Sequence, residues 1–120
     1  MPSFVKSVTF DCSSALLLAG FWAAALGSNV DEDSTDERAW VEPAGWGGPN
    51  LWFQRVPEGK TAKNRQHFDL TPAAGSDQQT EVERLISLGA ERIDIGQGAV
   101  SWVVMADPDG NEFCVLARRE

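Results

Sequence analysis

The stretch ADPDGNEFCVL, at residues 106–116, carries the strongest local structural signal in the sequence. Its first part, DPDG at residues 107–110, has the composition of a tight turn, because proline fixes its own φ and glycine tolerates a positive φ. Apolar residues flank this turn over residues 100–105 and 112–116. The pattern therefore predicts a β-hairpin formed by the last two strands of a sheet.

A strand, a helix and a further short strand precede this hairpin. Residues 65–70 end in an alternation of polar and apolar side chains, which is typical of a strand with one buried face. Residues 77–89 have the apolar spacing of an amphipathic helix, and a glycine closes it. Residues 92–95 alternate again, so the predicted order in this half is one strand, one helix and three strands.

The first half of the chain repeats this order. Residues 4–12 alternate as a strand. Ser13 and Ser14 offer an N-cap for an apolar helix over about residues 15–27, and Gly27 is expected to close it as a C-cap. Further strands are expected at residues 39–42 and 50–56, on either side of a loop rich in glycine and proline. The first strand and the helix of this half are thus followed by strands, as in the second half.

Corresponding features of the two halves lie about sixty residues apart, as with Ser7 and His67. The sequence therefore predicts an α+β fold of two βαβββ modules, at about residues 1–58 and 63–120. A chain of 120 residues can bury one core, so we expect both modules to form a single domain.

Charge and cysteine content restrict the function classes. The 18 acidic and 10 basic residues give a net charge of -8, which repels phosphate backbones and anionic lipid surfaces. We therefore expect no nucleic-acid partner and no membrane association. Cys12 and Cys114 lie far apart without any metal-ligand spacing, so two free thiols in a cytoplasmic protein are expected.

The apolar run over residues 15–26 allows two interpretations. It is shorter than the ~20 residues that span a bilayer, but it resembles the apolar core of a secretory signal peptide. The strand-like alternation before it, and the charge of Asp11, favour a buried helix. A signal peptide remains the alternative.

The order of elements, together with KNRQHFDL at residues 63–70 and ADPDGNEFCVL, resembles the vicinal oxygen chelate superfamily. More closely, it is similar to the glyoxalase-like domains of the glyoxalase, bleomycin resistance and dioxygenase type. The resemblance covers nearly the whole chain. It implies that each module curls its sheet around a cleft, that paired modules close a pocket for a small-molecule ligand, and that the protein is a homodimer.

The resemblance also implies where a metal would bind. Metal enzymes of the superfamily place one ligand on each of four strands, and these positions fall at Ser7, at Trp52 or Gln54, at His67 and at Cys114. Only His67 is a good ligand, and neither metal-binding carboxylate is present. We therefore expect no required cofactor. The alternative is a divalent metal such as zinc, held by His67, Gln54 and Cys114.

Strand alternation predicts which side chains line the cleft. One face of the predicted strands carries polar residues, while the opposite face is apolar and must cover the helices. Trp46 lies in a glycine-rich loop and is expected to face a ligand, whereas Trp22 and Trp40 are expected in the core. The predicted ligand-binding residues are Ser7, Thr9, Trp46, Trp52, Gln54 and Cys114.

The candidate catalytic residues are His67, Asp69 and Glu112. A carboxylate beside His67 would stabilise the imidazolium that forms when histidine acts as a general base. The alternative interpretation is a hydrogen-bonded ladder across the cleft, with Cys114 as a packing thiol.

Three functions follow from these observations. The sequence favours a metal-independent protein that binds an organic metabolite or drug in an aromatic and polar cleft. The first alternative is a lyase, isomerase or dioxygenase-type enzyme that uses His67 as a base or metal ligand. The second is an interaction module whose own side chains fill the cleft.

Overall fold

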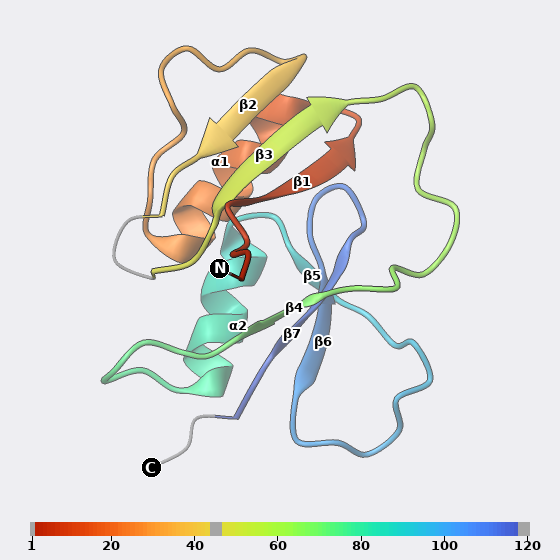
Figure 1. Cartoon of the computed structure of the whole chain (residues 1–120). Helices are drawn as coiled ribbons and strands as arrows, with labels where there is room; N and C mark the ends of the chain where they lie inside the picture. Colours follow the sequence, from red (N-terminus) through yellow and green to blue (C-terminus); the bar gives the residue numbers. More distant parts are fainter. Residues whose placement is uncertain (1, 44–46, 118–120) are drawn as a thin grey trace. The chain divides into compact units, whose positions relative to one another are not determined.

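The computed structural model describes residues 2–43 and 47–117, and the chain divides into two compact units, Met1–Lys60 and Thr61–Glu120 (Figure 1). Each unit contains one helix and one small mixed sheet. The α+β class predicted from the sequence is confirmed. That the two modules form a single domain stays a prediction.

The first unit contains three strands and a helix. These are β1 (Ser7–Cys12), α1 (Ala15–Leu26), β2 (Arg38–Val41) and β3 (Asn50–Arg55). The strand order is β1-β3-β2, with β1 parallel and β2 antiparallel to β3. The βαβββ order requires one more strand in this unit, and an isolated bridge from Val30 to Val41 stands in its place. Acidic and turn-forming residues follow Val30 directly, which explains why this pairing does not extend.

Both ends of α1 have the predicted caps. The Ser14 side chain accepts a hydrogen bond from the backbone N–H of Leu17, and Gly27 ends the helix at φ 70°. The buried face of α1 includes Leu18 and Trp22, and the Phe10 ring of β1 lies 5.9 Å from the Trp22 ring. Trp22 is 1% exposed, so its predicted place in the core is confirmed.

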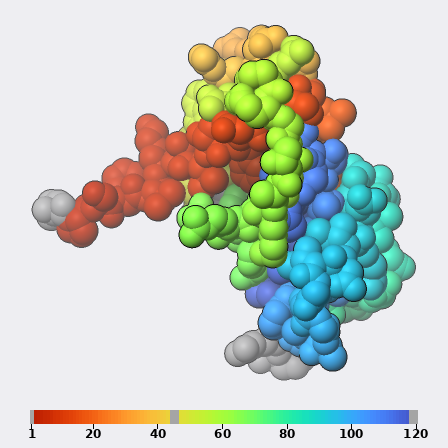
Figure 2. Space-filling model, turned by 90° about the vertical axis from the view of Figure 1, so that its right-hand side faces the viewer, coloured from red at the N-terminus to blue at the C-terminus, as the bar shows by residue number. Residues whose placement is uncertain are grey.

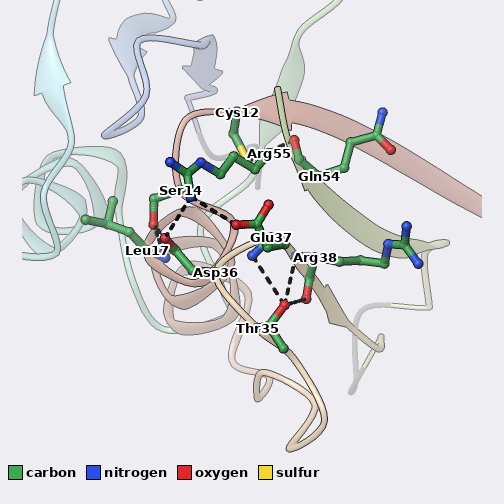
Figure 3. A network of polar contacts seen from close by, with 9 residues as sticks. All are labelled: Cys12, Ser14, Leu17, Thr35, Asp36, Glu37, Arg38, Gln54 and Arg55. Atoms are coloured by element: carbon green, nitrogen blue, oxygen red, sulfur yellow. Dashed lines mark hydrogen bonds and ion pairs between the residues drawn. The ribbon is translucent and has the colours of Figure 1, made fainter. Parts of the chain in front are cut away.

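A polar network fastens the start of α1 to the end of β3 (Figure 3). The Ser14 hydroxyl donates to the Asp36 carboxylate, and Arg55 Nη1 lies 3.9 Å from Asp36 Oδ2 and 3.0 Å from Glu37 Oε1. Both carboxylates belong to the acidic stretch at residues 31–38. They link β3 to the helix N-terminus, but the ion pairs are at least half exposed and individually weak.

Residues 2–5 lie outside the sheet. The predicted strand over residues 4–12 begins only at Ser7, and the segment before it, in dark red, extends away from the rest of the first unit (Figure 2). Its Phe4 and Val5 side chains are 84% and 70% exposed. The alternation of polar and apolar residues therefore begins before the first residue of β1 that pairs with β3.

The second unit has the complete βαβββ order. Its elements are β4 (Phe68–Leu70), α2 (Gln78–Ser87), β5 (Glu91–Arg92), β6 (Val103–Ala106) and β7 (Glu112–Val115). The strand order is β4-β7-β6-β5, with β4 parallel to β7. The first sheet has the same order, with β1, β3 and β2 in the places of β4, β7 and β6. The bridge from Val30 to β2 corresponds to the pairing of β5 with β6.

The predicted hairpin is confirmed as β6 and β7. The buried Asp107 carboxylate closes its turn by accepting hydrogen bonds from the N–H groups of Asp109 and Asn111, each at 2.9 Å. Neither described helix is long and apolar enough to span a bilayer.

Candidate functional site

Two tryptophans form an aromatic surface on the first sheet. The rings of Trp40 and Trp52 stack with centroids 5.0 Å apart and an angle of 23° between their planes. The two residues are partners in the β2–β3 register, and both are half-buried. Stacked rings of this kind present a flat, largely apolar surface.

The position of Trp40 corrects an expectation. Trp40 was expected in the core, but its neighbours Ala39 and Val41 are fully buried against the helix side of the sheet. Because side chains alternate along a strand, Trp40 must point to the other face. Alternation within residues 39–41 was the signal that could have placed it there.

The predicted polar residues of the first unit share this face. Thr9 pairs with Trp52 in the parallel β1–β3 register, and Ser7 is the exposed residue two positions earlier. Gln54 Nε2 donates to Asp11 Oδ1 at 2.7 Å. We call the side chains of Ser7, Thr9, Asp11, Trp40, Trp52 and Gln54 the tryptophan face. Trp46 lies outside the described residues.

The second unit brings together three of the predicted site residues. His67 Nδ1 lies 3.2 Å from Asp69 Oδ1, and one ligand atom each of His67, Asp69 and Cys114 lies within 4.8 Å of the others. Asp69 and Cys114 are partners in the β4–β7 register. His67 comes directly before β4, not within the strand as expected, so its backbone is outside the ladder.

Glu112, the third candidate catalytic residue, has a different environment. It is 7% exposed, and its Oε1 accepts a hydrogen bond from the backbone N–H of Asn64 at 2.6 Å. The Asn64 side chain in turn donates to Asn111 Oδ1. This bond fixes the chain three residues before His67, so Glu112 positions the segment that carries the histidine.

The Cys114 thiol is buried and stays protonated near neutral pH. Burial raises its pKa above the usual value, and the negative charge of Asp69 raises it further, against a smaller opposite effect of Lys63. A nucleophilic cysteine needs a lowered pKa. The environment therefore argues against Cys114 as a nucleophile in the metal-free protein.

The sequence profile of the glyoxalase-like domain matches residues 7–116. The chain belongs to this family. The resemblance to glyoxalase-like domains of the vicinal oxygen chelate superfamily is thereby confirmed. No curated protein sequence matches the chain significantly.

Solved structures of glyoxalase-like proteins share the fold. A possible glyoxalase from Bacillus cereus has a TM-score of 0.69 at 15% identity, over 97% of this chain and 100% of that chain. A variant of the fosfomycin resistance protein FosX from Listeria monocytogenes, complexed with Mn(II) and 1S,2S-dihydroxypropylphosphonic acid, has a TM-score of 0.70 at 16% identity, over 99% and 93% of the two chains. A glyoxalase/bleomycin resistance protein/dioxygenase family enzyme from Burkholderia phytofirmans PsJN has a TM-score of 0.63 at 15% identity, over 92% and 94%.

The four metal-ligand positions implied by the family do not suit a hard ion such as manganese in this chain. In the first unit they fall at Ser7 and at Trp52 or Gln54, and the Gln54 amide is bonded to Asp11. In the second unit they are His67 and Cys114. Manganese favours carboxylate, carbonyl and water oxygens, so a set of hydroxyl, amide, imidazole and thiol groups fits it poorly.

Proposed function

We propose that the chain binds a small, planar and largely apolar organic molecule on the tryptophan face, and that this binding requires no metal ion. The observation that carries the proposal is the stacked, half-buried pair of Trp40 and Trp52. Aromatic rings at a protein surface bind planar molecules through buried area and stacking.

The surroundings of the pair support a defined orientation of the ligand. Thr9 lies beside Trp52, and the hydrogen-bonded side chains of Asp11 and Gln54 lie in the next row of the sheet. These hydroxyl, carboxylate and amide groups offer both donors and acceptors at the edge of an apolar surface. A few polar groups around an aromatic centre are what ligand sites use for specificity.

The solved neighbours support the general class. Their names include fosfomycin resistance proteins and a family named for glyoxalase, bleomycin resistance and dioxygenase. A small organic metabolite or drug is therefore the class of ligand that we propose for this chain.

Tryptophan fluorescence during a screen of planar metabolites and antibiotics, with a chelator present throughout, tests this proposal. We expect a hit to bind Trp52→Ala at least about tenfold more weakly than wild type, because about 1.4 kcal/mol of stacking and buried area is lost. Trp102→Ala is the matched control, since Trp102 is 41% exposed and belongs to the other unit. Equal affinity of the Trp52 variant, or binding that the chelator abolishes, would refute the proposal.

The contact between His67 and Asp69 favours a second candidate function, in which the chain is a lyase, isomerase or dioxygenase-type enzyme. The 3.2 Å separation lets the carboxylate accept a hydrogen bond from the imidazole and orient it for proton transfer. In that case His67→Ala should abolish turnover of the ligand while leaving its binding intact. Unchanged turnover in this variant would exclude the candidate.

Partners and location complete the proposal. We propose a cytoplasmic homodimer without a nucleic-acid partner. The net charge of -8 supports the absence of nucleic-acid binding, and two buried free thiols suit a reducing compartment.

A further inference from the structure

We propose that His67, Asp69 and Cys114 form a zinc site that is complete within the second unit, with water as the fourth ligand. The three side chains supply one nitrogen, one oxygen and one sulfur atom, all within 4.8 Å of one another. This ligand set differs from the one that the family resemblance implies, because Asp69 takes part and no residue of the first unit is needed.

The distances suit a tetrahedral ion. Zinc binds nitrogen and oxygen at about 2.0–2.1 Å, so two such ligands at the tetrahedral angle lie about 3.3 Å apart. His67 Nδ1 and Asp69 Oδ1 are already 3.2 Å apart. A zinc–sulfur bond of about 2.3 Å requires a sulfur atom slightly farther away, at about 3.6 Å from the other two ligands. Small rotations of His67 and Asp69 can meet this requirement, since both side chains are exposed.

The backbone fixes the framework of the site. Cys114 lies in β7, which pairs with β4 on one side and β6 on the other, so its sulfur is held in the middle of the sheet. Register places Asp69 directly beside it. The bond from Asn64 to Glu112 holds the segment that leads to His67. A rigid thiol and two adjustable exposed ligands allow an ion to enter from solvent and be enclosed on binding.

The donor chemistry selects the ion. Thiolate and imidazole are ligands that zinc and cobalt prefer, whereas manganese stands lowest in the affinity order of divalent ions for such sites. A carboxylate and a thiolate together carry two negative charges, which balance the charge of the ion. We therefore expect zinc and cobalt to bind well and manganese to bind poorly.

Cobalt and zinc titrations of the full chain without a polyhistidine tag test the site. Cobalt should produce a sulfur-to-metal charge-transfer band and the strong visible bands of a tetrahedral ion, at one equivalent per chain. Zinc should displace the cobalt and bind at least about 100-fold more tightly than manganese.

Four variants assign the ligands. Cys114→Ser should remove the charge-transfer band, and Asp69→Asn and His67→Gln should weaken zinc binding by at least about tenfold. Asp69 and His67 are exposed, so their variants should fold even if Cys114→Ser does not. Cys12→Ser is the matched control, because Cys12 is the chain's other buried thiol and lies in the first unit.

Several results would overturn the site. These are the absence of a band in wild type, a band that survives Cys114→Ser, zinc affinity unchanged in both Asp69→Asn and His67→Gln, and manganese affinity equal to that of zinc. The zinc site and the tryptophan face share no residue. Ligand binding is tested with a chelator and zinc binding without an organic ligand, so either proposal can fail while the other holds.

Discussion

Trp22 and Trp40 belong to the same small sheet-and-helix unit but have different environments. Trp22 extends from α1 into the core, while Trp40 extends from β2 onto the opposite face and stacks on Trp52. Residue type alone does not separate these two cases. The deciding feature is the pair of small buried residues beside Trp40, because alternation then assigns the tryptophan to the other face.

Cys114 makes stability depend on pH. Its pKa is raised in the folded protein by burial and by Asp69, whereas the unfolded chain has an ordinary thiol pKa of about 8.5. The folded state keeps a proton that the unfolded chain releases, so this contribution is fully present below about pH 8.5 and is lost as pH rises toward the raised pKa.

Urea denaturation between neutral and alkaline pH, with a chelator present, measures this effect. We expect the free energy of unfolding to fall above about pH 8.5 more steeply in wild type than in Cys114→Ser. Comparing the two proteins removes the contribution of every other group. Equal slopes would contradict a raised pKa at Cys114.

At the scale of the element, two glycines of α1 have different roles. The helical conformation at Gly20 does not require a glycine, whereas the conformation at the C-cap, Gly27, does. Gly20 lies in the helix with nothing within 4 Å of the position where a Cβ would stand. Gly27 has φ 70°, a conformation that residues with a side chain rarely adopt. The same substitution should therefore have opposite effects at the two positions.

We expect Gly20→Ala to stabilise the protein by about 0.5–1 kcal/mol and Gly27→Ala to destabilise it by about 1–2 kcal/mol. The first change reduces the conformational freedom of the unfolded chain, and the second places a Cβ in the left-handed region. Chemical denaturation measures both. Destabilisation by Gly20→Ala would contradict the open space beside this residue.

Elements with strong local signals were predicted well. The caps of α1, its apolar composition and the DPDG turn specify structure through contacts between near neighbours. Strand ends were predicted less well, as at residues 4–6 and 65–67, which alternate without joining a ladder. A strand ends where its partner ends, and that information lies elsewhere in the chain.

At the scale of the whole molecule, the projecting segment at residues 2–5 bears on the proposed homodimer. Phe4 and Val5 are the most exposed large apolar side chains among the described residues. Apolar side chains gathered on a projecting segment are typical of a surface that another chain covers.

We expect wild type to sediment as a dimer, and the double variant Phe4→Ser/Val5→Ser to dissociate at least about tenfold more readily, because the interface loses buried apolar area. Ile95→Ser is the control, since Ile95 is exposed but belongs to the second unit. Sedimentation equilibrium over a range of concentrations measures the association. A monomeric wild type would refute the homodimer, and an unchanged double variant would exclude this segment from its interface.

The sequence by itself determined the order of the elements, its repetition and the hairpin, because these depend on caps, turns and alternation within a few neighbouring residues. The motifs at residues 63–70 and 106–116 carried the resemblance to the family. Only the tertiary structure decided that Asp69 lies beside Cys114, that Glu112 binds the backbone of Asn64, and that Trp40 stacks on Trp52. Each of these contacts joins separate segments. Strand register sets which residues meet, and register is a property of the paired strands together and not of either one alone.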